Sequence, residues 1–583
     1  MRQQYAWRSL LLNSTMAFLA VAVVLQIVRI QASAEASQFR QQAKGFEGKW
    51  VTYYPERGEI YDRYGHLLAG NQTVYEVGVD LDTDFDAYSL AMVASSYFNK
   101  DYDSVYNAIV NPPPDIHFLV IENYAPSQAV DHVKEFMAEL EKQDDPGFDL
   151  TGLEFNPRLH RSYPEIALAS NLIGFVNHEG RGYFGVEEKY NDLLAGNPVQ
   201  VWVPTDPNRA FEIPRIPNGT SLILTIDRDL QDAIEDILEQ SLDHYGATQG
   251  TIIVMDPSNG EILALASTPR MDLNQFWNYT SIYKNASEYN RAISSPYEPG
   301  SVIKMFTMAA ALDTGTVTPT TTYLDTGEYQ IGGSIIRNWD GKAWGMQTML
   351  GCIQHSLNVC LTWVASQLGP QTFYGYMNRF GFGHLTGVDL AGETPGRLKI
   401  PGDSDWYPVD LGTNSFGQGM TATPLQVMTA ATAIANRSKM VTPHVLFAML
   451  RDGHQFNVPS QYIGSPIEPE TAATLNEMLA VALENEDSAA LIPGYRIAGK
   501  TGTAQIPTPF GIYDYSQTNT SFIGWGPADD PQFMIYVWLE RPTKSIWGTE
   551  TAAPVFSEVA QKAVILLDIP PDNVRHQLST QRE

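Results

Sequence analysis

The sequence is poor in cysteine and lacks the histidine patterns of metal enzymes. Only Cys352 and Cys360 occur among 583 residues, too few for a disulfide framework or a cysteine metal cluster. On one continuous helix their Cα atoms would lie about 12 Å apart, too far for a disulfide. A turn between the two cysteines would make a disulfide possible. There is no His-Glu-x-x-His, so the sequence suggests neither a metal site nor a cofactor.

Basic residues are also scarce. The chain has 37 lysine and arginine residues against 66 aspartate and glutamate residues, a formal charge of -29. That charge repels phosphate backbones, which excludes nucleic acid as a favoured partner and indicates a well-solvated acidic surface. With 44% hydrophobic residues and this length, two or more folded domains are expected.

Charge is absent altogether from residues 9–28, a run of 20 residues that spans about 30 Å as a helix. We predict a cytoplasmic tail at residues 1–8 and a single transmembrane anchor at residues 9–30. Arg2 and Arg8 precede the run and acidic residues follow it, so the positive-inside rule puts the N-terminus in the cytoplasm and the rest outside. A cleaved signal peptide is the alternative, with Ala32-Ser33-Ala34 as its cleavage site.

Residues 31–210 show mixed short strands and helices and are predicted to form an elongated α/β pedestal domain. Residues 57–71 alternate apolar and polar side chains around a turn, as a hairpin does. Arg57, Asp62 and Arg63 in this segment are equally compatible with a structural ion-pair network. Glycines 180, 182 and 185 do not match a dinucleotide fingerprint, so turn geometry is the better explanation for them.

Residues 211–566 form a second predicted domain, followed by a C-terminal tail at residues 567–583. A periodic helix over 228–242 precedes a hairpin that turns at Ser258-Asn259-Gly260. Strands and helices arrive in unequal blocks, which indicates an α+β fold with a mostly antiparallel sheet covered by helices.

Ser301 and Lys304 carry the first chemical pattern. They follow Pro299-Gly300 at the start of a helix-compatible run, so hydroxyl and amine share one helical face. A buried lysine with a lowered pKa can take the serine proton and make the hydroxyl a nucleophile. Ser281 and Lys284 have the same spacing, but they lie in a polar stretch that predicts a surface loop.

Two further patterns follow along the chain. Ser356 and Asn358 form the only Ser-x-Asn, which is suited to proton relay and to binding a peptide amide, although the same tripeptide is also a common turn. In residues 500–503, Lys500 and the hydroxyls of Thr501 and Thr503 are suited to a carboxylate, and Gly502 leaves room for a substrate backbone. Residues 494–501 also match a phosphate loop, but Gly502, Pro507 and Pro509 oppose the helix that such a loop must open.

Together and in this order, the three patterns form the signature of penicillin-binding proteins and class A β-lactamases. Residues 57–69 and 182–196 resemble the pedestal motifs of class B penicillin-binding proteins, the monofunctional transpeptidases. Residues 379–396 and 416–436 resemble the division-specific branch of that family. The resemblance covers nearly the whole chain. It departs from the family at Cys360, where a small residue is common, and in lacking a C-terminal β-lactam-sensing repeat.

The resemblance implies a peptidoglycan D,D-transpeptidase that binds β-lactams and works at the division septum. Ser301 would be acylated by a D-Ala-D-Ala stem peptide and Lys304 would be the general base. Ser356 and Asn358 would assist, Lys500, Thr501, Gly502 and Thr503 would complete the pocket, and the N–H groups of Ser301 and Thr503 would form the oxyanion hole. No paired-glutamate polymerase pattern is evident, so a glycan-polymerising membrane partner is implied, beside division or elongation proteins.

Several other functions are compatible with the same motifs. An elongation-type transpeptidase, a D,D-carboxypeptidase and a β-lactamase would differ in their substrate or in the fate of the acyl-enzyme. A non-catalytic β-lactam sensor or division scaffold would use the motifs for binding or not at all. The pedestal motifs favour transfer to an amine, and the complete set of motif residues favours catalysis.

Overall fold

The computed structural model describes residues 3–32, 48–142, 147–205, 207–212, 214–507 and 513–580. Ser33 and Ala34 of the candidate cleavage site, as well as Arg2 and Pro509, lie outside these ranges. Contacts divide the chain into two compact units, Met1–Glu56 with Gly196–Gly219 and Arg57–Ala195 with Thr220–Glu583.

The first unit contains one long helix and a two-stranded ribbon. Helix α1 (Gln3–Ala32) includes the predicted anchor, and its segment Trp7–Ala32 is the one stretch of the described chain long and apolar enough to cross a membrane. Strands β1 (Gly48–Tyr53) and β8 (Val199–Pro204) pair antiparallel, and the rings of Trp50 and Trp202 meet edge to face. The short helix η1 (Pro207–Glu212) follows β8.

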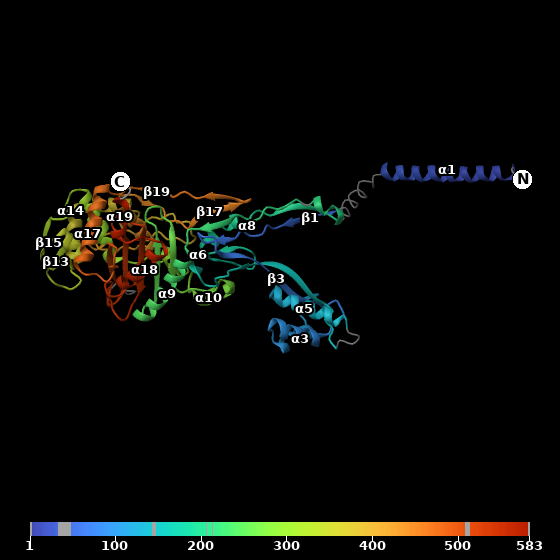
Figure 1. The fold of residues 1–583 in the computed structure, drawn as a ribbon, viewed down its shortest axis with the longest axis horizontal. Helices are drawn as coiled ribbons and strands as arrows, with labels where there is room; N and C mark the ends of the chain where they lie inside the picture. The colour runs from blue at the N-terminus through green and yellow to red at the C-terminus, as the bar shows by residue number, and fades with distance from the viewer. Residues whose placement is uncertain are drawn as a thin grey trace. The chain divides into compact units, whose positions relative to one another are not determined.

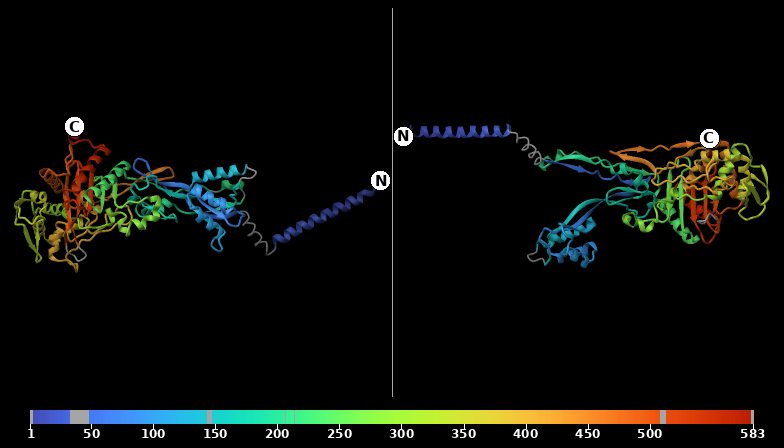
Figure 2. Two further views of the ribbon diagram at one scale, coloured as in Figure 1. Left: turned by 90° about the horizontal axis from the view of Figure 1, so that it is seen from below. Right: turned by 180° about the vertical axis from the view of Figure 1, so that it is seen from behind.

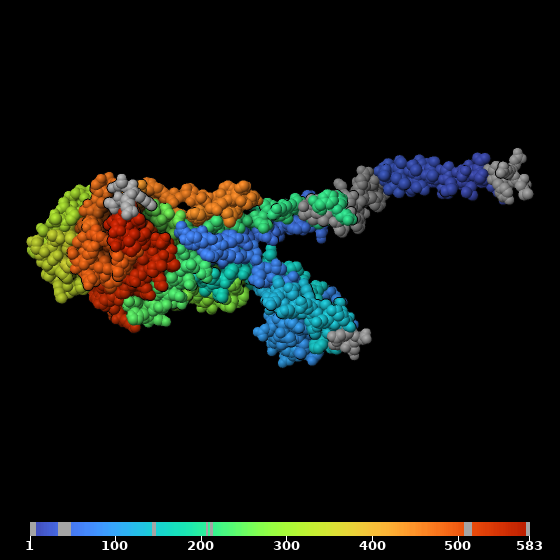
Figure 3. Space-filling model, viewed as in Figure 1, coloured from blue at the N-terminus to red at the C-terminus, as the bar shows by residue number. Residues whose placement is uncertain are grey.

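A seven-stranded sheet runs through the second unit. Its order is β18-β17-β9-β2-β3-β4, with β5 also paired to β3. The strands are β2 (Ile60–Tyr61), β3 (Leu67–Asp80), β4 (Phe118–Pro126), β5 (Leu153–Ser162), β9 (Ser221–Leu224), β17 (Leu446–Arg451) and β18 (His454–Asn457). Strands β2 and β3 form the hairpin predicted at residues 57–71. Every residue of β18 is exposed, and the β17–β18 hairpin is part of the orange surface in Figure 3.

Three helices pack against strands β3, β4 and β5 of this sheet (Figures 1 and 2). Together they enclose a separate apolar core that includes Val77, Leu90 and Val130. They are α3 (Ala87–Phe98), α4 (Tyr102–Val110) and α5 (Ser127–Leu140). The segment that follows β5 is built from short elements, which are α6 (Ser170–Ile173), β6 (Phe175–Val176), β7 (Gly182–Tyr183), α7 (Gly185–Lys189) and α8 (Asn191–Ala195). The predicted turn geometry is found at Gly180 and Gly185, whose φ values are +79° and +50°. Gly182 instead lies in β7, where an added Cβ atom would lie 2.0 Å from the carbonyl oxygen of Glu187, so it permits close packing.

The charged residues of the first hairpin have separate partners and do not form one network, since Arg63 pairs with Glu261 and Arg57 pairs with Glu187. Arg57 and Arg161 both bind the fully buried carboxylate of Glu187. Asp62 instead closes the β2–β3 turn, where its carboxylate accepts hydrogen bonds from the backbone N–H groups of Tyr64 and His66. These charged residues therefore fix the structure of the hairpin and its neighbours.

An antiparallel five-stranded sheet forms the centre of the second predicted domain. Its order is β11-β10-β22-β21-β20, so β20 is an edge strand. The bounds are β10 (Gln249–Met255), β11 (Ile262–Ser267), β20 (Ala498–Pro507), β21 (Tyr513–Gly526) and β22 (Phe533–Glu540). Strands β10 and β11 form the hairpin predicted around residues 258–260.

Helices cover both faces of this sheet because its strands bury alternate side chains on opposite sides. Ile252 and Val254 of β10 pack in one core with α9 (Arg228–Tyr245) and α18 (Ala552–Leu566). Ile253 and Met255 pack in a second core with α12 (Lys304–Asp313), α16 (Pro424–Ala435) and α17 (Pro469–Asn485). The α+β architecture predicted from the sequence is thus confirmed.

The remaining elements lie in the second unit. The helices are η2 (Leu273–Asn278), α10 (Tyr279–Ile282), η3 (Ala286–Glu288), α11 (Arg291–Ser294), η4 (Gly300–Ile303), α13 (Met349–Gln354), α14 (Asn358–Arg379), α15 (Pro408–Asn414) and α19 (Asp572–Thr580). The strands are β12 (Thr322–Asp325), β13 (Glu328–Ile331), β14 (Ser334–Arg337), β15 (Gly345–Thr348), β16 (Met440–Val441) and β19 (Tyr462–Gly464). The predicted C-terminal tail thus includes a helix, α19.

Candidate active site

Ser301 lies in the 3₁₀ turn η4, directly before α12. The N–H of Lys304 donates to the carbonyl of Ser301, and residues three apart eclipse each other in such a turn, so both side chains share one face. Gly300 precedes the serine with φ +63°, and its N–H donates to the carbonyl of Gly417 at 3.0 Å. A Cβ atom at Gly300 would lie 2.8 Å from the carbonyl oxygen of Thr503, so glycine permits the close approach of β20.

The amine of Lys304 is fully buried and joins the first two motifs. Its Nζ donates to the carbonyl of Ser356 at 2.5 Å, to Ser356 Oγ at 3.1 Å and to Asn358 Oδ1 at 2.8 Å. No hydrogen bond in the described chain joins this amine to Ser301. Burial, with a further contribution from the charge of Lys500, holds the pKa of Lys304 well below its usual value. Both effects favour the neutral form of the amine.

Ser356 occupies a turn between α13 and α14. Its φ is +53°, a conformation that costs a non-glycine residue about 1 kcal/mol, and backbone hydrogen bonds from Ser356 to Ile353 and from Leu357 to Cys352 hold it. Cys352 and Cys360 flank the turn and form a disulfide, with Cα atoms 6.0 Å apart. The expectation from one continuous helix, that these cysteines are too distant, is wrong because the turn brings the two helices together.

His355 braces the same turn. Its Nδ1 lies 3.2 Å from the carboxylate of Glu486, and its ring stacks on Trp344 with centroids 4.5 Å apart. Its carbonyl accepts a hydrogen bond from the indole N–H of Trp339 at 3.1 Å. These contacts hold His355 in the turn between α13 and α14.

Lys500 comes from edge strand β20 and is also buried. Its Nζ donates to Thr501 Oγ1 at 3.1 Å and to the Thr501 carbonyl at 3.3 Å. Burial lowers its pKa to about 8, although the charge of Glu486 opposes this shift. Since the charge of Lys500 acts on Lys304, the third motif is electrostatically coupled to the first.

Close backbone packing places β20 against η4. A Cβ atom at Gly502 would lie 2.2 Å from Ser521 Oγ and 3.0 Å from a methyl of Val302, so no larger residue fits there without displacement. The hydroxyl of Thr503 accepts a hydrogen bond from the N–H of Gly548 at 3.0 Å. Residues 498–507 are a strand and do not open a helix, which excludes the phosphate-loop interpretation of residues 494–501.

Two tryptophans connect the elements that carry the second and third motifs. Trp339 is held at the Ser356 turn by its indole N–H, and Trp547 immediately precedes Gly548, which is bonded to Thr503. Their rings meet edge to face with centroids 5.2 Å apart, and Trp339 remains 49% exposed. The site therefore has an aromatic rim beside its polar interior.

Two family models match the chain. The penicillin-binding protein transpeptidase domain matches residues 250–561, and the penicillin-binding protein dimerisation domain matches residues 52–209. The chain is 30% identical over 544 residues to stage V sporulation protein D of Bacillus subtilis, which covers 91% of this chain and 81% of that protein. The chain belongs to the class B penicillin-binding proteins.

Further comparisons support this assignment. The chain is 30% identical to the probable peptidoglycan D,D-transpeptidase PenA of Neisseria gonorrhoeae, over 88% of this chain and 85% of that one. The crystal structure of penicillin-binding protein 3 from Mycobacterium tuberculosis with aztreonam has the same fold, at a TM-score of 0.68 and 24% identity, and the match covers 89% of this chain and 98% of the other. This penicillin-binding protein is thus a serine-type peptidoglycan D,D-transpeptidase by family.

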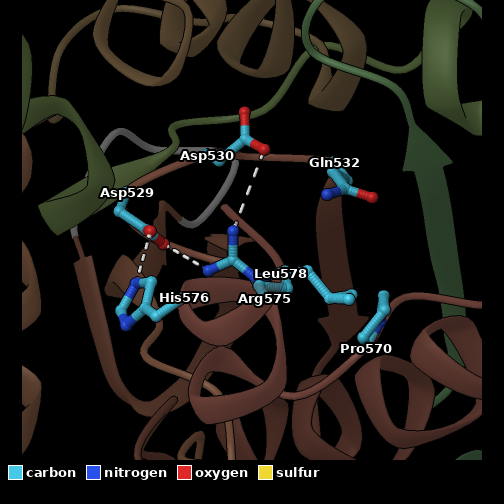
Figure 4. A pocket seen from close by; sticks show the side chains of 7 residues that line it. All are labelled: Asp529, Asp530, Gln532, Pro570, Arg575, His576 and Leu578. Atoms are coloured by element: carbon cyan, nitrogen blue, oxygen red, sulfur yellow. Dashed lines mark hydrogen bonds and ion pairs between the residues drawn. The ribbon is translucent and has the colours of Figure 1, made fainter. Parts of the chain in front are cut away.

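The second Ser-x-x-Lys pair lies elsewhere on this penicillin-binding protein. Ser281 is exposed in the short helix α10, and its hydroxyl donates to the carbonyl of Asn278 at 2.7 Å. The predicted surface position of Ser281 is confirmed, but the predicted loop is wrong because residues 279–282 form a short helix. A surface pocket lined by Asp529, Asp530, Gln532, Pro570, Arg575, His576 and Leu578 contains none of the motif residues (Figure 4).

The motifs did not reveal every group beside the serine. The carboxylate of Glu298, three residues before Ser301, accepts a hydrogen bond from the N–H of Gly419 at 3.0 Å. The ring of Phe416 lies 6.0 Å from Lys304 Nζ. Two features of the sequence could have indicated these groups. They are the carboxylate just before Pro-Gly-Ser and the glycine-rich residues 416–419.

Proposed function

We propose that this chain cross-links peptidoglycan stem peptides through an acyl-enzyme on Ser301 and is acylated at the same residue by β-lactams. The observation that carries the proposal is the buried amine of Lys304, which is hydrogen-bonded to Ser356 and Asn358 and has a lowered pKa. A neutral amine in the first turn after the serine is a suitable base for its proton.

In the first half-reaction, Ser301 Oγ attacks the carbonyl carbon of the penultimate D-Ala and its proton passes to Lys304. The peptide C–N bond then breaks, and the departing amine of the terminal D-Ala takes a proton relayed from Lys304 through the hydroxyl of Ser356. The 3.1 Å hydrogen bond between Lys304 Nζ and Ser356 Oγ supports this relay. In the second half-reaction an amine of another stem attacks the ester, and Ser301 regains its proton.

The remaining residues bind the substrate in this proposal. Lys500, with Thr501 and Thr503, receives the terminal carboxylate, and Asn358 holds a peptide amide. Gly502 lets the substrate backbone approach β20. The N–H groups of Ser301 and Thr503 stabilise the oxyanion of the tetrahedral intermediate.

The cellular role is a further part of the proposal. Residues 379–396 and 416–436 support a role at the division septum, while the charges around residues 9–28 support a cytoplasmic N-terminus with the enzyme outside the membrane. A glycan-polymerising membrane protein is the proposed partner. Depleting the protein should yield undivided cells, whereas loss of cell shape with normal division would assign it to elongation.

The acyl-enzyme is tested with a labelled penicillin and the purified full-length chain. We expect one labelled serine, loss of the label in Ser301→Ala, and retained label in the matched control Ser281→Ala. Labelling that survives Ser301→Ala rejects the proposal. Supplying a stem-peptide donor with a D-amino-acid acceptor then separates transfer from hydrolysis.

A further inference from the structure

Glu298, three residues before the candidate nucleophile, carries a carboxylate that none of the three motifs includes. Both of its oxygens accept hydrogen bonds from the hydroxyl of Tyr513, at 3.1 and 3.2 Å, and one also accepts the N–H of Gly419 at 3.0 Å. Glu298 and Tyr513 are both partly exposed. The carboxylate is therefore fixed in position, and the residue that carries it is not fully buried.

Glu298 also lacks a cationic partner. Asp325 is likewise held only by neutral donors, but it is buried, whereas Glu298 is partly exposed. Two other shielded carboxylates of the chain bind arginine. Glu187 binds two arginines, and Glu235 binds Arg270. The amine of Lys399 is bonded to Asp410 at 2.9 Å and does not bind Glu298. Burial raises the pKa of Glu298, and the positive charge of Lys399 opposes this shift only from a distance. Within the ranges that the structure describes, no lysine, arginine or histidine pairs with Glu298. A shielded carboxylate held only by neutral donors is suited to a cation brought by a ligand.

The position of Glu298 relates it to the donor peptide. Tyr513 is the cross-strand partner of Pro507, so it lies at the opposite end of β20 from Lys500. A peptide that places its carboxylate at Lys500 and runs along the free edge of β20 extends toward Tyr513 and Glu298. This orientation rests on the function proposed above.

The donor's own chemistry provides the cation. Cross-linking joins the donor acyl group to an amine of a second stem, and both stems are copies of one peptide, so the donor carries such an amine too. An alkyl amine of this kind is protonated at neutral pH.

The reach of the donor agrees with this position. The Cα atoms of Glu298 and Ser301, three residues apart, are at most about 11 Å from each other. The residue before D-Ala-D-Ala lies about 3.5 Å further along the donor, and a long side chain adds about 6 Å.

We propose that Glu298 is a specificity residue that binds the ammonium group on the donor residue preceding D-Ala-D-Ala, with Tyr513 and Gly419 holding the carboxylate in place. The enzyme thereby distinguishes stems with a free side-chain amine at this position from stems in which that amine is already amidated. A stem that has served as acceptor is consequently a poorer donor.

The test compares two tripeptide donors that differ only in this charge, Nα-acetyl-Lys-D-Ala-D-Ala and its Nε-acetylated form. The full-length chain in detergent is labelled with a fluorescent penicillin, and the readout is the concentration of each donor that halves the labelling rate. Wild type should prefer the charged donor about tenfold. Glu298→Gln should bring the ratio close to one. The control Glu486→Gln, which removes a charge near Lys500, should keep the preference.

Each result decides between the inference and its premise. If wild type treats both donors alike, or Glu298→Gln keeps the preference, the inference is wrong while labelling at Ser301 still supports the proposed function. If penicillin does not label Ser301 at all, the proposed function fails first. If Glu298→Gln does not fold, the wild type is tested at two salt concentrations. Raising salt from about 0.05 to about 0.5 M should reduce its preference for the charged donor over the acetylated donor severalfold. A preference that does not depend on salt overturns the inference.

Discussion

Two buried charge clusters in the same compact unit are built in opposite ways. In the first, Arg57 and Arg161 surround the carboxylate of Glu187, so every ionised group has a counter-charge. In the second, Lys304 and Lys500 are buried near each other, and the charge of each is opposed by burial. The first arrangement pairs opposite charges and fixes the structure. The second arrangement favours the neutral amines of Lys304 and Lys500. A neutral amine can accept a proton, as a general base in catalysis must.

Substituting Lys304 should give the largest effect on chemistry. Lys304→Arg keeps a positive charge but cannot release a proton near neutral pH, so we expect penicillin acylation to slow by about 10³-fold or more. Acylation rates under single-turnover conditions provide the measurement. Lys399→Arg, at a lysine paired with Asp410, is the matched control. If the acylation rate of Lys304→Arg lay within tenfold of the wild-type rate, the functional distinction between the two clusters would be wrong.

Breaking the paired cluster should affect stability and leave the chemistry of the folded fraction intact. Glu187→Gln leaves two arginines without their counter-charge, and we expect a loss of about 3 kcal/mol or more in unfolding free energy. Urea unfolding followed by tryptophan fluorescence measures this loss. The exposed ion pair between Arg337 and Glu328 provides a control. Glu328→Gln removes this pair at the surface and should change the unfolding free energy by less than about 1 kcal/mol. Equal effects of the two substitutions would contradict a structural role for the buried network.

The disulfide connects stability with the site. Replacing both cysteines by serine opens a loop with a sequence separation of 8, which should cost about 2 to 3 kcal/mol by the chain-entropy estimate. The Ser356 turn would also lose its constraint, so acylation should slow severalfold. Stability and acylation are measured for the double variant and for the reduced wild type, which should agree. Unchanged acylation in both would show that backbone hydrogen bonds alone hold the turn.

The sequence predicted the parts of this site that depend on local spacing. Ser301 and Lys304 share a face because they are three residues apart. The apolar runs in residues 250–267 and the turn between them predicted the hairpin and its two covered faces. The disulfide was not predictable from spacing, since it depends on a turn at a serine with positive φ. The partners of Lys304, Ser356 and Asn358, come from a segment more than 50 residues away, and only the tertiary fold brings them to the amine.

The smallest predicted effect concerns the coupling between the two buried lysines. The charge of Lys500 lowers the pKa of Lys304, so Lys500→Met should raise that pKa. In the proposed mechanism acylation requires neutral Lys304, so its rate should fall as pH drops through the pKa of this amine. Removing Lys500 should therefore move the acidic limb of the pH profile to higher pH. The wild type should in addition lose affinity for carboxylate-bearing substrates above about pH 8, where Lys500 loses its proton. An acidic limb that stays in place in Lys500→Met would mean that burial alone sets the proton affinity of Lys304.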